Sequence, residues 1–258
     1  DGFVSIEVSP RLARDTAGTI EEAKRLHARL NRPNVMIKIP GTKEGLPAIQ
    51  ECLEAGISIN ITLLFSVENY VEVANTYCKA LRARVAKGFF VSRVDVIIDS
   101  KLKEIIEAGG ENAEKAKGLL GALGIANSQV AYQRYLELFE SEAFADLKAA
   151  GAAVQRPLWA STSVKNPDTK DTAYVEALVG PETVNTLPHN TLAAFADHGE
   201  VARTIDKDVA EAMKVEASLK EIGVDVAACL EQLQQEGVEK FVQAFDSLNA
   251  ALEAKLSS

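Results

Sequence analysis

The 258-residue sequence lacks the features of a membrane-spanning or disulfide-stabilised protein. No apolar run approaches the roughly 20 residues that a membrane-spanning helix needs. The three cysteines, Cys52, Cys78 and Cys229, are odd in number and scattered among helical residues, which predicts reduced structural thiols rather than a disulfide framework. We therefore expect a cytoplasmic protein that does not contact a membrane.

The sequence is also short of positive charge and of ligand-binding motifs. Its 28 Lys and Arg residues against 37 Asp and Glu give a net charge of −9, which argues against nonspecific nucleic-acid binding. No spacing of His, Cys and carboxylate residues suggests a metal site, and no glycine-rich loop suggests a nucleotide, so we expect neither metal nor cofactor. An anionic small substrate stays compatible with this charge, because a local cationic pocket can coexist with an acidic exterior.

What the sequence does contain is a regular alternation of strand-like and helix-like segments. This order is typical of a parallel sheet built from βαβ units, and the length suits one large α/β domain over residues 1–258. The strand-like segments begin near Phe3, Val35, Ile57, Phe89, Val154 and Thr183, and the fourth extends to Asp95. From about residue 207 the chain is mostly helical, with Gly223 and Gly237 as predicted breaks.

Isolated polar residues share one face of the first three predicted strands. Alternate residues of a strand point to opposite faces, so in each strand the aliphatic residues occupy one face. The other face carries Glu7 in the first strand, Lys38 in the second, and Asn60 and Thr62 in the third. A lysine inside an apolar strand is costly to bury, so Lys38 lies either at a sheet edge or in a site that uses it. The convergence of all four residues on one face favours an active site.

Several segments, in this order, resemble the transaldolase family, and the likeness covers essentially the whole chain. They are SIEVSPRL at residues 5–12, IKIPGT at 37–42, INITLLFS at 59–66, FVSR at 90–93, WAST at 159–162, KNP at 165–167 and TVNTLP at 183–188. The pattern is most similar to the bacterial branch that sometimes occurs fused to a glucose-6-phosphate isomerase. No such second domain is expected within these residues.

The resemblance implies a (β/α)₈ barrel of the class I aldolase type. Since six strands are predicted where such a barrel has eight, and the first of them resembles the family's third, we expect two βα units to be missing upstream. The family's aspartate acid–base on the first strand and asparagine on the second then have no counterpart, and a chain without them should be inactive and unfolded. The abrupt connection at Lys87-Gly88 predicts that residues are absent there too. An open six-stranded sheet is the alternative.

The resemblance further implies a Schiff-base enzyme of the pentose phosphate pathway. It would transfer a dihydroxyacetone unit from a ketose phosphate, such as sedoheptulose 7-phosphate or fructose 6-phosphate, to an aldose phosphate. Lys38 would form the imine, for which apolar surroundings favour the neutral amine. Glu7 would handle protons through a water held by Thr62, or else serve only as a salt-bridge partner of Lys38. Asn60 would bind substrate hydroxyls, or else tie adjacent strands together.

Three cationic or hydroxyl side chains are candidates for binding the substrate phosphate. Arg93 is the strongest, because its planar guanidinium matches phosphate geometry, although Asp95 is an alternative, purely structural partner. Ser161 and Lys165, after the next predicted strand, would complete the site, with an ordinary solvated loop lysine as the other interpretation of Lys165.

Two competing functions are a fructose 6-phosphate aldolase, which releases dihydroxyacetone, and a noncatalytic scaffold in which Lys38 and Glu7 form an ion pair. Sugar phosphates are the expected binding partners in either enzyme. We expect a monomer or a homodimer.

Overall fold

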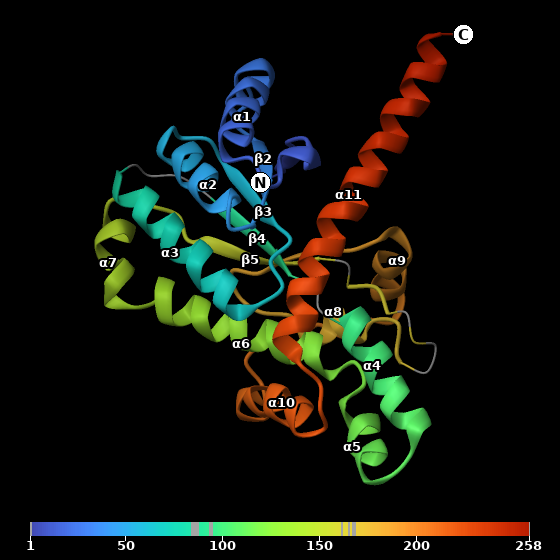
Figure 1. The fold of residues 1–258 in the computed structure, drawn as a ribbon. Coiled ribbons are helices and arrows are strands. Elements are labelled where there is room, and N and C mark those ends of the chain that lie inside the picture. Colours follow the sequence, from blue (N-terminus) through green and yellow to red (C-terminus); the bar gives the residue numbers. More distant parts are fainter. Residues whose placement is uncertain are drawn as a thin grey trace.

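The chain forms an α/β structure around one parallel sheet (Figure 1). A computed structural model describes residues 2–83, 88–92, 95–160, 162–164, 166 and 169–257, with the backbone alone described for 88–92 and 95–97. Within these residues six strands pair in parallel and in chain order, as the alternation of segments predicted. The strands are β1 (Val4–Glu7), β2 (Val35–Pro40), β3 (Ile59–Thr62), β4 (Gly88–Ser92), β5 (Gln155–Ala160) and β6 (Val184–Thr186).

Helices follow the strands and build most of the remaining structure. They are the 3₁₀ helix η1 (Pro10–Leu12), α1 (Thr16–Leu30), α2 (Gly45–Glu54), α3 (Val67–Ala83), α4 (Asp95–Ala108), α5 (Glu111–Leu119), α6 (Ala122–Phe139), α7 (Glu142–Ala149), α8 (Ala173–Ala177), α9 (His189–His198), α10 (Val209–Glu221) and α11 (Val226–Leu256). No helix in the described part of the chain combines the length and the apolar character needed to cross a bilayer.

The aliphatic faces of the central strands form the main hydrophobic core. Ile37 and Ile39 of β2 and Ile59 and Ile61 of β3 are all fully buried, against side chains from α1, α2, α3 and α6. The expectation that helices cover this face is confirmed for β2 and β3. It is wrong for the start of β1, where Val4 is 63% exposed.

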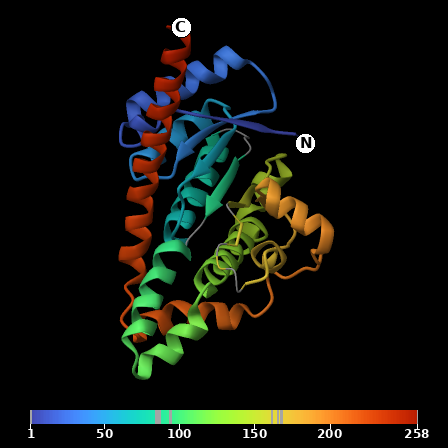
Figure 2. The same cartoon turned by 90° about the vertical axis from the view of Figure 1, so that its right-hand side faces the viewer.

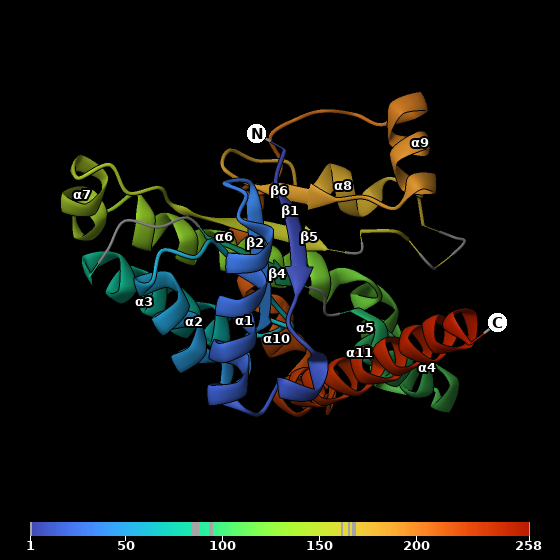
Figure 3. The ribbon, with the colours of Figure 1, turned by 90° about the horizontal axis from the view of Figure 1, so that it is seen from above.

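A second, smaller core lies away from the sheet. It joins buried residues of α4, α5, α10 and the first turns of α11, among them Leu102, Leu219 and Leu230. From this core α11 runs the length of the molecule and reaches the ends of β1 and β2, and its C-terminal part projects beyond the rest of the fold (Figures 1, 2 and 3). The exposure of Leu248, Leu252 and Leu256 along that part agrees with this position.

Two predicted boundaries were wrong, and both bear on the site. The fourth strand ends at Ser92, and Asp95 is the first residue of α4 rather than a strand residue beside Arg93. Gly237 does not interrupt the helical tail but lies inside α11, where a Cβ atom would come within 2.8 Å of Leu63 Cδ2. The missing side chain at Gly237 therefore serves close packing of α11 against the end of β3. Gly223, with φ +88, does separate α10 from α11.

Candidate active site

Strand register brings the polar residues of β1, β2 and β3 to the same face. Glu7 pairs with Lys38, Lys38 with Asn60, and Pro40 with Thr62. Paired residues of a parallel sheet present their side chains to the same side, so these polar groups meet near the carboxyl ends of the strands. Binding sites of parallel α/β proteins form at these ends.

Lys38 and Glu7 form the centre of this cluster. The Lys38 ammonium donates to the Glu7 carboxylate, and the two side chains are 21% and 37% exposed. The Lys38 Nζ atom also lies 5.2 Å from the ring centroid of Phe241, which comes from α11. Lys38 is therefore neither a buried unpaired charge nor a freely solvated one.

A small pocket opens beside this ion pair. It is lined by Glu7, Lys38, Thr62, Leu63 and Phe241, among others, and its volume is about 20 Å³. A space of this size holds about one water molecule, and its lining is mostly apolar, with Glu7, Lys38 and Thr62 as its polar residues. Thr62 is 8% exposed, so little of it is open to bulk solvent.

Asn60 makes the strand-tying contact that was one of its two predicted roles. Its Nδ2 donates to Ser5 Oγ at 2.9 Å, which ties β3 to β1 across the face of β2. Its Oδ1 is buried and has no hydrogen-bond partner among the described residues. An orphaned buried carbonyl oxygen is costly unless something else donates to it. It is thus available to a ligand hydroxyl.

The loop after β2 is anchored by buried hydrogen bonds. Thr42 Oγ1 donates to Ala13 O at 2.6 Å and accepts from Gly45 N at 3.0 Å. Gly45 opens α2, and a Cβ atom there would lie 2.1 Å from Pro40 O. The start of α2 is therefore in direct backbone contact with the residue that ends the Lys38 strand.

Helix α11 is fastened to the ends of β2 and β3. Gln234 Nε2 donates to Leu63 O at 3.1 Å and, more weakly, to Gly41 O at 3.4 Å. Leu63 has a left-handed backbone with φ 61, which is strained for a residue with a side chain. Farther along α11, Asp246 accepts from Arg11 NH2 at 2.8 Å.

The three predicted phosphate ligands, Arg93, Ser161 and Lys165, lie outside the described residues. Next to them, the buried Thr162 donates through Oγ1 to Asn185 Oδ1 at 2.8 Å, which joins the end of β5 to β6.

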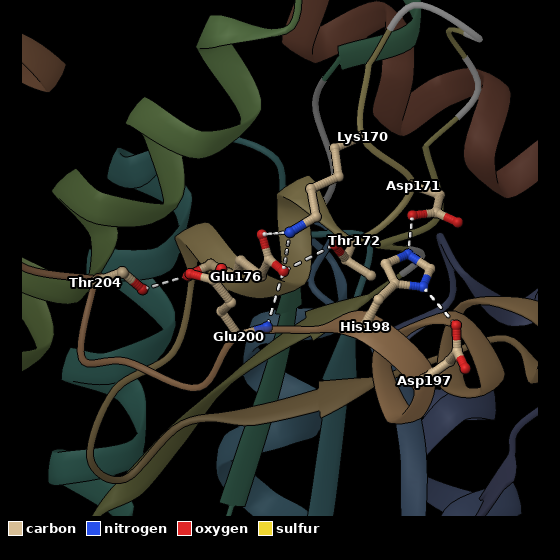
Figure 4. A network of polar contacts seen from close by, with 8 residues as sticks. All are labelled: Lys170, Asp171, Thr172, Glu176, Asp197, His198, Glu200 and Thr204. Atoms are coloured by element: carbon tan, nitrogen blue, oxygen red, sulfur yellow. Dashed lines mark hydrogen bonds and ion pairs between the residues drawn. The ribbon is translucent and has the colours of Figure 1, made fainter.

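A polar network secures the segment between β5 and α8 (Figure 4). The Glu176 carboxylate accepts from Lys170 Nζ at 2.7 Å, Thr172 Oγ1 at 2.9 Å and the Glu200 backbone N at 2.9 Å. These donors, the Lys170 ammonium above all, lower the pKa of Glu176.

His198, at the end of α9, bridges two carboxylates of the same network. Its ring nitrogens lie 2.8 Å from Asp171 Oδ1 and 3.1 Å from Asp197 Oδ2. The hydrogen bond with Asp171, followed by that with Asp197, raises the pKa of His198. Through the Asp171 contact, His198 ties the end of α9 to the segment before α8, which is a structural role.

Sequence reasoning missed Phe241 and gave no task to Ser5. Ser5 shares the polar face of β1 with Glu7, so its alternation with Ile6 was a usable signal. Phe241 had no such signal, because only the tertiary path of α11 brings it to Lys38.

Comparison with known proteins gives a family match and several similar relatives. The family model for transaldolase/fructose-6-phosphate aldolase matches residues 1–252. Transaldolase 2 of Nostoc sp. is 45% identical over 99% of this chain and 71% of its own length. Transaldolase 1 of Streptomyces coelicolor is 48% identical over 100% of the chain and 69% of its own length, and the transaldolase of Mycolicibacterium smegmatis 46% over 100% and 71%. The chain belongs to the transaldolase/fructose-6-phosphate aldolase family.

Proposed function

We propose that this chain is a transaldolase in which Lys38 forms a Schiff base with a ketose phosphate. Transaldolase function in the pentose phosphate pathway is supported by the family match over 252 residues and by relatives of that name at 44–48% identity. The observation that carries the role of Lys38 is its position. Lys38 lies on a β strand and is ion-paired to Glu7. It lines a pocket with the volume of about one water molecule, and it shares a face of the sheet with Asn60 and Thr62.

In the proposed reaction, Lys38 Nζ attacks the C2 carbonyl of the ketose and water leaves, giving a protonated imine. A base takes the proton of the C4 hydroxyl, the electron pair of the C3–C4 bond passes through C3 to the imine nitrogen as that bond breaks, and the aldose phosphate departs. The resulting enamine attacks the aldehyde carbon of the acceptor, whose oxygen takes up a proton, and water then hydrolyses the imine to release the product ketose phosphate and free Lys38. Attack needs an uncharged amine, so the Lys38 proton must first pass to Glu7 or to the water between Glu7 and Thr62.

The binding roles follow from the same geometry and from the family. The unpartnered Asn60 Oδ1 would accept from a substrate hydroxyl. We assign the phosphate to Arg93, with Ser161 and Lys165 completing its site, because guanidinium groups match phosphate in shape and charge. Replacing Arg93 by alanine should raise KM strongly, by the equivalent of about 1.5–3 kcal/mol for a charged hydrogen bond.

We further infer that the six strands belong to an eight-stranded barrel of the class I aldolase type. This inference is supported by the family, by the parallel order β1 to β6, and by the exposure of Val4 on β1. Relatives are longer, since the chain spans only 69–71% of their length. Determining the amino-terminal sequence and mass of the native protein tests it. Two further βα units are expected. A native mass too small to include them would contradict the barrel and favour an open six-stranded sheet.

A cytoplasmic location is proposed from the three cysteines, all of which are free thiols. Size-exclusion chromatography with light scattering would distinguish a monomer from a homodimer.

Borohydride trapping tests the covalent step. The full-length protein treated with fructose 6-phosphate and borohydride should carry a stable adduct on Lys38, located by peptide mass mapping. Lys43, in the following loop, is the matched control residue. An adduct on Lys43, or none in an active preparation, would overturn the assignment of Lys38. Activity should survive EDTA, because the imine is the electron sink; a loss that zinc restores would favour a metal-dependent aldolase.

Glu7→Gln tests the proton-transfer role, because it keeps the shape of the side chain and removes the base. We expect kcat to fall about 10²–10⁴-fold with little change in KM. Unchanged kcat with a lower melting temperature would make Glu7 a structural partner of Lys38.

Acceptor dependence separates transferase from lyase. A transaldolase holds the three-carbon unit as an enamine, so fructose 6-phosphate alone should turn over slowly until erythrose 4-phosphate is added. Equal release of dihydroxyacetone without the acceptor would identify the lyase.

A further inference from the structure

Phe241 is the one aromatic side chain with a cation–π contact to Lys38 in the described part of the chain. Its ring centroid lies 5.2 Å from Lys38 Nζ, inside the roughly 6 Å over which an aromatic ring attracts a cation. The ring also lines the pocket shared by Glu7 and Thr62. The contact therefore involves the atom at which the proposed chemistry occurs, not the lysine stem.

We propose that Phe241 stabilises the positive charge on the Lys38 nitrogen during catalysis, through its ring rather than through packing alone. This inference rests on the proposed Schiff-base function. The protonated imine carries its charge at the same nitrogen as the resting ammonium, so a ring that faces one faces the other. A neutral ring also complements Glu7, because it attracts the cation without accepting its proton. The carboxylate can then exchange protons with the pocket water while the nitrogen keeps a second favourable contact.

The way α11 is attached supports a defined position for this ring. Gln234, Gly237 and Val238 precede Phe241 by seven, four and three residues, so they lie on the same side of the helix. Gln234 donates to the carbonyl of Leu63, Gly237 approaches Leu63, and Val238 lines the pocket. One side of α11 is thus held on the strand ends two turns and one turn before the ring.

Beyond the ring, α11 makes a second contact, at the surface of the protein. Asp246 pairs with Arg11, which belongs to η1 directly after β1. Phe241 lies between this exposed ion pair and the Gln234 hydrogen bonds, so α11 contacts the strand ends and η1 on both sides of the ring.

The experiment compares aromatic and nonaromatic replacements in the full-length protein. Phe241→Leu and Phe241→Met keep an apolar side chain but remove the ring, whereas Phe241→Tyr keeps a ring. The rate of borohydride trapping on Lys38 with fructose 6-phosphate is measured together with kcat, KM and the melting temperature. Asp246→Asn, which loosens α11 without changing the ring, is the control for helix attachment.

We expect Phe241→Leu and Phe241→Met to lower the trapping rate and kcat by about 5–30-fold, with KM little changed and Phe241→Tyr near wild type. The role of the ring would be overturned if the wild type formed the Lys38 adduct and both nonaromatic variants formed it at the same rate. So would a Phe241→Tyr variant as impaired as Phe241→Leu, because the loss would then follow packing. Absence of any Lys38 adduct in the wild type would instead refute the proposed Schiff-base function.

Discussion

Replacing Gly45 by alanine should disturb the Lys38 strand through backbone contact alone. Gly45 is buried at the start of α2, and an added Cβ would lie 2.1 Å from Pro40 O, where such contacts essentially never fall below 3.0 Å. The start of α2 or the end of β2 must therefore move by at least 0.9 Å (3.0 − 2.1). The contacted atom belongs to backbone, so no side-chain rotation can relieve the clash.

The size of the effect follows from two opposing terms. Overpacking a well-packed site costs about 1–3 kcal/mol, whereas alanine in a helix gains about 0.5–1 kcal/mol over glycine. The net loss is then at most about 2.5 kcal/mol, or about 10 °C in melting temperature for a domain of this size. Because Pro40 follows Lys38 by two residues, a displacement near 1 Å should also lower kcat, by up to about 10²-fold.

Gly118→Ala provides the matched control. Gly118 is exposed in α5, and a Cβ atom added there would have no neighbour within 4 Å among the described residues, so alanine should stabilise the protein slightly. Urea unfolding and steady-state kinetics on both variants of the full-length protein would measure the contrast. If Gly45→Ala matched Gly118→Ala in stability and kept wild-type kcat, the proposed coupling between α2 and the Lys38 strand would be refuted.

Three further predictions concern groups outside the reacting centre. Gln155 is fully buried, and its side-chain amide has no hydrogen-bond partner among the described residues. Gln155→Met should therefore raise the free energy of unfolding, measured by urea titration, by about 1–3 kcal/mol. A loss of stability would show that the amide is hydrogen-bonded. Burial raises the pKa of Cys52 to about 11, so mass spectrometry should find it unalkylated by iodoacetamide at pH 8 until denaturant is added, and rapid labelling of the folded protein would contradict this. Because the pKa of His198 is raised in the folded state, its contribution to stability is complete below about pH 6.5 and is lost as pH rises through the folded-state pKa. His198→Asn should therefore lower the melting temperature at pH 5.5 but not at pH 9. An equal loss at both pH values would exclude the two carboxylate contacts as the cause.

The sequence predicted those parts of the site that depend on strand alternation. Because side chains of a strand alternate between two faces, Glu7, Lys38 and Asn60 each lie on the polar face of their strand, independently of the rest of the fold. Parallel pairing then aligns the three residues. Helix packing carries no such short-range rule. The low helix propensity of Gly237 is a local property and predicts a helix break, whereas its close approach to Leu63 is a tertiary property that the local sequence does not carry. Phe241 was missed for the same reason.

The path of α11 also sets the order in which the site can assemble during synthesis. Lys38 and Phe241 are separated by 203 residues (241 − 38), and a ribosome adds about 5–20 residues per second. The strand bearing the lysine therefore leaves the ribosome roughly 10–40 s before the ring that covers its amine. Throughout that interval the nascent chain presents Lys38 without its aromatic cover, and only the synthesis of α11 completes the pocket.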